Sequence, residues 1–342
     1  MTWWQSSAVR RWAGWAGAAM VLAASAVAGP SAAMADGCAT TGNFLHRVTG
    51  DWDGDGDDTI GLYNQWTATW YLRNTNTAGA PDLCFRYGVP GDLPVVGDWD
   101  GNGADTVGVA RVSHAVNTWL WVLSNRNASG GGDVIFHYGL HAVVVQGAHT
   151  RSEPITGDWD GDGDTNIGVT ETGQTHRRWH LREVNSAGAD TLAFMYGRSW
   201  RGPDSDVDLP PDSPVVGDWD GNGTDTVGII RWSDDEPEDW HLRNTNTPGN
   251  PDIAFRFGDL PSNGNSRTHY AGHMVVGDWN GSGSGDGPGH VQWLNRDDPA
   301  TPHREFIAQW ALRERPSAGL PSKVFQYGEA LYGVPTPSLP DF

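Results

Sequence analysis

The sequence predicts an all-β protein, a β-propeller of five four-stranded antiparallel blades. An acidic segment of ten residues occurs five times, and the copies start 47, 60, 60 and 60 residues apart at Gly50, Gly97, Gly157, Gly217 and Gly277. Repeats of this length indicate an array of small units that stack or close into a ring. The chain also contains 46 Gly, 21 Pro and 19 Trp among 342 residues, a composition that favours short strands and turns over helices.

Two expected strands flank each acidic segment. An apolar run leads into it, at 93–96, 154–155, 214–216 and 274–276. A second run follows it, at 60–63, 107–109, 167–169 and 227–229. One glycine stands at the same point of this second strand in four copies, which predicts either a bulge or a close approach of the backbone. These glycines are Gly61, Gly108, Gly168 and Gly228.

Two further strands complete each repeat. The third contains a Trp-x-Leu pattern, and the fourth ends in Phe-x-aromatic-Gly; the alternate spacing places the apolar side chains of each on one face. A four-stranded unit is too small to bury its own faces. We therefore interpret the tryptophans as core between neighbouring units, with platforms for sugar stacking as the alternative. The Trp-x-Leu tryptophans are Trp70, Trp121, Trp179, Trp240 and Trp310.

The first 35 residues show the pattern of a secretory signal peptide. Arg10 and Arg11 precede an apolar stretch over 12–28, and Ala33-Met34-Ala35 is typical of a cleavage site. An uncleaved membrane anchor is the alternative, and the arginine pair is a weak indication of twin-arginine export. No later segment is apolar enough to span a bilayer. We expect a protein that is secreted or held at the cell surface.

The remaining chain divides into a lead-in, a repeat region and a tail. In an oxidising environment the two cysteines, Cys38 and Cys84, are expected to form a disulfide rather than remain free thiols. This bond would tether the lead-in, 36–49, to the first repeat. The five repeats span 50–328, and a proline-rich tail occupies 329–342. The sequence shows no split blade to close the ring, although residues near Phe44 are candidates for an outer strand.

The acidic segments concentrate negative charge. The chain has a formal net charge of −20, and 17 of its 42 Asp and Glu lie in the five segments. Such a surface disfavours nucleic acid as a partner. Clustered carboxylates repel one another unless cations neutralise them. In the first segment Asp51, Asp53 and Asp55 stand at positions 1, 3 and 5, Gly56 permits a sharp turn, and the carbonyl of Asp57 is available at position 7. This spacing predicts a calcium loop. An EF-hand or a dockerin is excluded, because no helix and no glutamate at position 12 follow.

The pattern resembles the FG-GAP/VCBS-type repeats of integrin-α-like calcium-binding β-propellers, in their bacterial GDWDGDG form. The likeness covers nearly the whole chain after the signal pattern, including the Phe-x-Tyr-Gly end, the acidic loop and the strand after it. The resemblance implies one calcium ion per loop in a secreted or surface protein. It also implies a role in adhesion, in carbohydrate or protein binding, or as a module attached to an extracellular hydrolase.

The candidate metal ligands stand at alternate positions of the loops. They are Asp51, Asp53, Asp55, Asp57 and Thr59; Asp98, Asp100, Asn102, Ala104 and Thr106; Asp158, Asp160, Asp162, Asp164 and Asn166; Asp218, Asp220, Asn222, Thr224 and Thr226; and Asp278, Asn280, Ser282 and Asp286. The family pattern has Asp at position 9, where four loops here have Thr or Asn. We therefore expect modest affinity, about 10⁻⁴–10⁻³ M. By carboxylate count the first and third loops are the strongest and the fifth the weakest; acidic turns without metal are the alternative.

The connections between the later repeats are longer than the first, and in a meander they lie on the face opposite the acidic loops. Exposed loops on a rigid scaffold often carry binding residues. The alternative is that they are variable, solvated connections. The candidate ligand-binding residues in them are His141, His149, Arg151, Trp200, Arg201, Arg267, His269, Tyr270 and His273.

No catalytic motif is present: the chain has no HExxH, no GxSxG and no glycine-rich phosphate loop. We expect a monomeric calcium-stabilised module that binds a glycan or protein and has no intrinsic catalysis. The alternative is an extracellular polysaccharide hydrolase or lyase with its site in the long connections. A spacer that belongs to a separate catalytic domain is a third interpretation.

Overall fold

A computed structural model describes residue 38 and residues 45–145, 148–173, 175–198, 211–231, 238–258, 273–295 and 304–332. The predicted signal peptide, the region near Phe44 and residues 333–342 of the predicted tail lie outside the described residues.

The first blade contains β1 (Leu45–Gly50), β2 (Thr59–Asn64), β3 (Thr69–Leu72) and β4 (Leu83–Arg86). The second contains β5 (Leu93–Gly97), β6 (Thr106–Ser113), β7 (Thr118–Leu123) and β8 (Val134–Leu140). The third contains β10 (Ala148–Gly157), β11 (Asn166–Thr172), β12 (His176–Arg182) and β13 (Leu192–Arg198), and an additional strand, β9 (Ala142–Val145), pairs with β10. The fourth contains β14 (Ser213–Gly217), β15 (Thr226–Arg231), β16 (Asp239–Leu242) and β17 (Ile253–Arg256). The fifth contains β18 (His273–Gly277), β19 (Gly287–Asn295), β20 (Arg304–Leu312) and β21 (Lys323–Tyr332).

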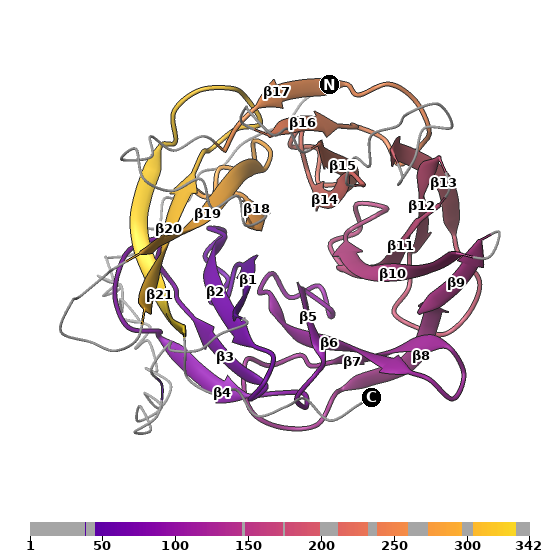
Figure 1. The fold of residues 1–342 in the computed structure, drawn as a ribbon, viewed down its shortest axis with the longest axis horizontal. Coiled ribbons are helices and arrows are strands. Elements are labelled where there is room, and N and C mark those ends of the chain that lie inside the picture. The colour runs from indigo at the N-terminus through magenta and orange to yellow at the C-terminus, as the bar shows by residue number, and fades with distance from the viewer. Residues whose placement is uncertain are drawn as a thin grey trace, which may run out of the picture. The chain divides into compact units, whose positions relative to one another are not determined.

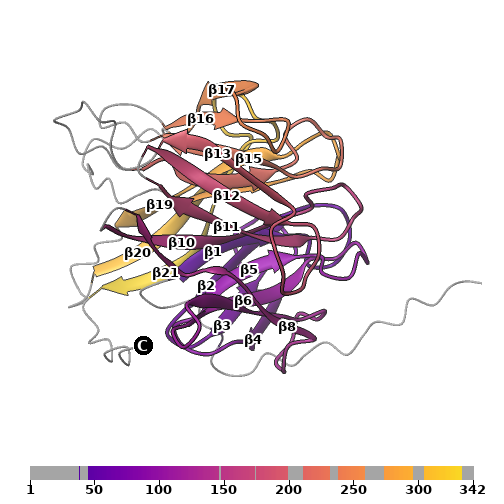
Figure 2. The same cartoon turned by 90° about the vertical axis from the view of Figure 1, so that its right-hand side faces the viewer.

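Each sheet is an antiparallel meander in which strands consecutive in sequence pair with one another. The five sheets surround a common axis, with β1, β5, β10, β14 and β18 innermost and the last strand of each blade at the rim (Figure 1). The turned view shows the blades stacked around this axis with loops on both sides (Figure 2). The predicted five-bladed propeller is confirmed.

The tryptophans of the third strands lie in the seams between blades. Trp70, Trp121 and Trp179 are fully buried, as are Trp240 and Trp310. Each indole N–H donates to the backbone carbonyl of the aromatic residue that precedes the glycine of the Phe-x-aromatic-Gly motif in the same blade, over distances of 2.9–3.1 Å. Their interpretation as inter-blade core is confirmed.

The glycine in each second strand permits a close approach. A methyl group at Gly61 would lie 2.8 Å from the side chains of Leu72 and Val48 and 3.3 Å from the ring of Trp52. Trp52 comes from the acidic loop and is buried. The equivalent contacts surround Gly108. The space at these two glycines is therefore filled by neighbouring side chains, including the loop tryptophan, rather than by the predicted close approach of another backbone.

The ring closes without a split blade, through hydrogen bonds that repeat at every seam. Asp58 N donates to Asp278 O over 2.9 Å, and Asp278 N donates to Asp58 Oδ2 over 2.7 Å, which joins the fifth blade to the first. Four equivalent pairs join the other blades, and in one of them Thr165 replaces the aspartate. We call these five pairs the inter-blade latches. The hydroxyl of Tyr327 also donates to Tyr71 O over 3.1 Å across the closing seam.

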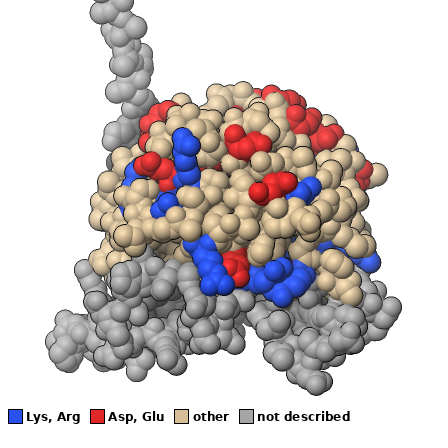
Figure 3. All heavy atoms as spheres, turned by 90° about the horizontal axis from the view of Figure 1, so that it is seen from above, with Lys and Arg blue, Asp and Glu red and all other residues tan. Residues whose placement is uncertain are grey.

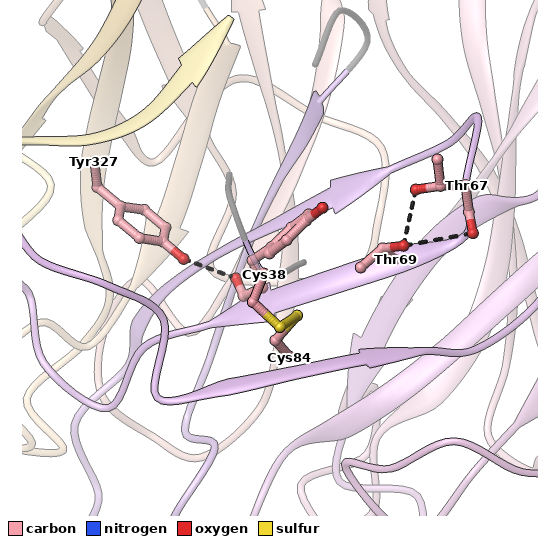
Figure 4. Close-up of a disulfide and its surroundings, with 6 residues drawn as sticks. Cys38, Thr67, Thr69, Cys84 and Tyr327 are labelled. Carbon is pink, nitrogen blue, oxygen red and sulfur yellow. Dashed lines mark hydrogen bonds between the residues drawn. A yellow bond between two sulfur atoms is a disulfide. The ribbon is translucent and has the colours of Figure 1, made fainter. Parts of the chain in front are cut away.

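The predicted disulfide is present. Cys38 and Cys84 are bonded, and the bond fastens the lead-in to β4 at the rim of the first blade (Figure 4). The hydrogen bond from Tyr327 of the fifth blade reaches the neighbouring strand β3 in the same view. Two long-range links therefore meet where the ring closes.

Two regions differ in detail from the expected boundaries. The connection between the second and third blades contains β9, which pairs with the first half of an extended β10. Its run of valines favours a strand, although no acidic loop or Trp motif marks it. At the other end β21 continues to Tyr332, whose partner is Arg304. Residues 329–332 thus belong to the last strand, and β1 places residues 45–49 in the first blade.

Candidate metal centre

The five acidic loops, at 50–59, 97–106, 157–166, 217–226 and 277–286, connect the first and second strands of their blades. The turns between third and fourth strands lie against them. Asn76 Nδ2 donates to Asp58 O over 2.8 Å, and equivalent bonds of 2.8–2.9 Å occur in the next three blades. Loop and turn therefore share one face of the ring, as the meander predicts. In the edge-on view of Figure 3, acidic side chains are frequent along the upper edge of the ring.

The first aspartate of each loop organises the backbone around itself. Asp51 Oδ1 accepts hydrogen bonds from Gly54 N over 2.7 Å and from Asp55 N over 3.1 Å, and its Oδ2 accepts one from Gly56 N over 2.8 Å. Gly54 and Gly56 have φ values of 74° and 94°, a conformation that glycine adopts at little cost. Asp158 makes the same three bonds in the third loop. The repeated spacing of aspartate and glycine thus encodes a tight loop whose side-chain oxygens point inward.

Two loops bring three carboxylates together. One oxygen from each of Asp51, Asp53 and Asp55 lies within 4.8 Å of the other two, and the same holds for Asp158, Asp160 and Asp162. Desolvation and the charges of the neighbouring aspartates raise the pKa of Asp53 and of Asp160. Crowded carboxylates of this kind favour a bound cation, which would neutralise their mutual repulsion. The first and third loops are the two that the sequence ranks highest.

The second and fourth loops keep the shape of the first with fewer charges. Asn102 and Asn222 occupy position 5, and each Oδ1 accepts the backbone N–H two residues on, as Asp55 and Asp162 do. Asp98 accepts N–H groups from two loop residues and Asp218 from three. Asp100 and Asp220 retain position 3. The residues at position 7 are Asp57, Ala104, Asp164 and Thr224, and each donates its N–H to the position 5 side chain.

The residues at position 9 face the strands. The hydroxyls of Thr59, Thr106 and Thr226 donate to the carbonyls of the glycines that open their loops, over 3.2–3.4 Å. Asn166 Nδ2 donates to Asp164 O over 3.2 Å. These groups begin the second strands, and they donate to backbone carbonyls rather than to the acidic cluster.

The fifth loop is one residue longer than the others. Gly287 pairs with Gly277 as Thr59 pairs with Gly50, so Gly287, not Asp286, is the counterpart of position 9. Asp286 is the counterpart of Asp58 and forms an inter-blade latch, in which its Oδ2 accepts Asp218 N over 2.9 Å. Asp278 still accepts Gly283 N over 2.6 Å. Asn280 and Ser282 occupy positions 3 and 5, and Ser282 Oγ lies 2.6 Å from Ser284 Oγ.

One residue near the first loop was missed by the sequence analysis. Asn74, in the turn after β3, donates from Nδ2 to Asp53 Oδ2 over 2.8 Å. Its Oδ1 is buried and has no hydrogen-bond partner. The signal in the sequence is the Asn or Glu that stands two residues after the Leu of each Trp-x-Leu motif.

A cavity of about 420 Å³ lies along the axis between the innermost strands. Its lining includes the latch side chains Asp58, Asp105, Thr165, Asp225 and Asp286. Desolvation raises the pKa of Asp105 and of Asp225 to about 7, and neighbouring carboxylates act in the same direction. These carboxylates are joined to backbone N–H groups of the adjacent blades and hold the ring together.

Four of the nine candidate ligand residues of the long connections fall within the described residues. His141 precedes β9, with its ring 5.0 Å from Trp119 and 5.8 Å from His114 between centroids. His149 and Arg151 lie in β10, and His273 is the first residue of β18. Trp200, Arg201, Arg267, His269 and Tyr270 lie outside the described residues.

The fold defines the protein as a β-propeller, and the chain also resembles solved structures of other proteins. No protein-family model and no curated protein matches the chain. A lectin from Agrocybe aegerita that recognises non-reducing terminal N-acetylglucosamine is similar at 14% identity and a TM-score of 0.38. The match covers 82% of this chain and 79% of the lectin. Within the part of the chain that the structure describes, no helix is long and apolar enough to cross a membrane.

Proposed function

We propose that the protein is a secreted calcium-binding β-propeller that recognises a glycan or protein ligand. The observation that supports this most strongly is the pair of aspartate triads on one face of the ring, each with three oxygens within 4.8 Å. The signal pattern at 1–35 and the disulfide between Cys38 and Cys84 support an extracellular location.

The donor set fits a hard divalent cation. The potential ligands in the first loop are the carboxylate oxygens of Asp51, Asp53 and Asp55. The neighbouring Asn74 has a buried Oδ1 that accepts no hydrogen bond. Calcium prefers carboxylate and amide oxygens in a flexible arrangement, whereas zinc prefers nitrogen and sulfur. The ion would neutralise the loop and fix it to the blade. An ion that binds only the folded chain stabilises it by about 2.7 kcal/mol per site at one hundred times its Kd.

We propose binding without turnover. Five copies of one acidic loop at equivalent places in a ring are expected of a structural device, whereas an active site needs a single set of residues with distinct roles. The long connections on the opposite face are then the proposed recognition surface, with His141 at the described end of one of them.

The test is a binding screen of the chain from residue 36 onward, on a glycan array and on cell-wall polysaccharide, in calcium and in chelator. Saturable binding that leaves the polysaccharide chain length unchanged is expected. Release of soluble products from a polysaccharide would contradict binding without turnover. Equal thermal midpoints in saturating calcium and in chelator would contradict the metal sites.

A further inference from the structure

The turn between the third and fourth strands lies against the acidic loop in four blades and can present a side chain to it. In the first blade this is Asn74, whose Nδ2 lies 2.8 Å from Asp53 Oδ2. Its Oδ1 is buried without a hydrogen-bond donor. A buried carbonyl-type oxygen without a partner costs free energy, and native proteins rarely leave one without a reason.

The same unpaired oxygen recurs in two more blades. Asn125 and Asn244 occupy the equivalent positions, and their Oδ1 atoms are also buried without a partner. The backbone holds all three residues alike: the N–H groups of Asn74, Asn125 and Asn244 donate to aspartate carboxylates eight residues on, over 2.8–2.9 Å. The unpaired oxygen therefore recurs in three blades with the same anchoring of the backbone.

The turn is fixed against the loop beside it. Two residues after Asn74, the side chain of Asn76 donates to Asp58 O, and the second, third and fourth blades contain the equivalent bond. Proline 316 stands at this place in the fifth blade and has no amide to donate. The turn that carries Asn74, or its counterpart, is therefore fixed beside the acidic loop in four blades.

We propose that this side chain supplies a further oxygen ligand to the cation of its loop, from outside the loop itself. The inference rests on the calcium binding proposed above. The two ends of an amide are alike in shape, so a half-turn of the Asn74 amide exchanges Nδ2 and Oδ1. Without a cation the amide N–H group faces the Asp53 carboxylate; with a cation the oxygen faces the ion. Both orientations satisfy the local charge.

The proposal assigns different strengths to the loops. Glu183 and Glu314 replace the asparagine in the third and fifth blades. The proposed ligands of the third site then include four carboxylates, from Asp158, Asp160, Asp162 and Glu183, and this site binds calcium more tightly than the first. Affinity rises with the number of charged ligands.

The test is calorimetric titration with calcium chloride of the chain from residue 36 onward. The background is the variant D160N/D162N, which removes two carboxylates of the third loop and leaves the first loop as the strongest site. N74A is expected to weaken the first site by at least about tenfold, and N74D to tighten it by a similar factor. Thr75→Ala, in the same turn, is the matched control and leaves the affinity unchanged.

The N74D variant distinguishes between Asn74 as a calcium ligand and Asn74 as only a hydrogen-bond donor to Asp53. If Asn74 only donates to Asp53, N74D places two carboxylates together and weakens calcium binding or leaves it unchanged, and either result overturns the inference. If the unmodified chain takes up no calcium, the proposed function fails first. Calcium uptake by the unmodified chain together with an unaltered affinity of N74A removes this inference alone.

Discussion

The inter-blade latch at Thr165 offers a direct measurement of what closes the ring. Asp98 N donates to Thr165 Oγ1 over 3.0 Å, and Thr165 N donates to Asp98 O over 2.7 Å. The other four latches use a carboxylate in place of this hydroxyl. Thr165→Val keeps the volume of the side chain and the bond from Thr165 N to Asp98 O. It removes the hydroxyl oxygen that accepts Asp98 N.

The expected loss of stability in T165V arises because the backbone N–H group of Asp98 is left without an acceptor. Asp98 is 9% exposed, so its N–H has little access to water once the hydroxyl is gone. Leaving a buried donor unpaired costs about 1–3 kcal/mol. For a chain of this size each kcal/mol lowers the thermal midpoint by about 2–4 °C. Thr165→Ser keeps the hydroxyl and is the matched control.

The assay is urea unfolding at one fixed calcium concentration, followed by the fluorescence of the buried tryptophans. T165V is expected to unfold at a lower urea concentration than T165S. The slope of unfolding free energy against urea should be the same for both variants, because they expose the same surface area on unfolding. A difference between the two variants of less than about 0.5 kcal/mol, the range of ordinary surface substitutions, would refute the role assigned to the latch.

Three further predictions concern a buried histidine, the tyrosine hydroxyls of the seams and the disulfide. Burial, with the charge of Arg47, lowers the pKa of His290 to about 4. The folded state therefore binds a proton at this histidine more weakly than the unfolded state does, so stability is lost as pH falls from about 6.5 toward 4. H290V should therefore retain roughly 2 kcal/mol more stability at about pH 5, measured by urea midpoints, and parallel pH profiles would contradict this. Phe257 lacks the hydroxyl with which four equivalent tyrosines bond across their seams; F257Y should gain about 0.5–1.5 kcal/mol, and a lowered thermal midpoint would count against it. Replacing both Cys38 and Cys84 with serine removes a disulfide that spans 46 residues and should lower the free energy of unfolding by roughly 2–4 kcal/mol. An unchanged thermal midpoint in oxidising buffer would show that the disulfide does not stabilise the fold.

Much of the fold could be predicted because its signals are local and repeated. Alternation places Trp70 and Leu72 on one face, and the spacing of aspartate and glycine makes Asp51 the centre of a tight loop. These features depend on a few neighbouring residues, and five copies make each of them readable.

Ring closure could not be predicted, because the atoms that close it are far apart in the sequence. Asp58 and Asp278 are 220 residues apart, and the repeated Asp or Thr before each second strand does not show in the sequence that its side chain accepts a backbone N–H group of the neighbouring loop. The same limit explains Asp286: one extra residue in the fifth loop shifts the alignment, and only the strand register reveals it. Asn74 was missed because its contact with Asp53 joins two different turns.

The measurement that tests the central claim most directly is a calorimetric calcium titration of the chain from residue 36 onward, beside the variant D53N/D160N. We predict saturable binding of at least two ions with Kd values of about 10⁻⁴–10⁻³ M, and the loss of both tightest sites in the variant. No saturable heat up to about ten times that concentration, or identical titrations of the two proteins, would contradict calcium binding by the aspartate triads.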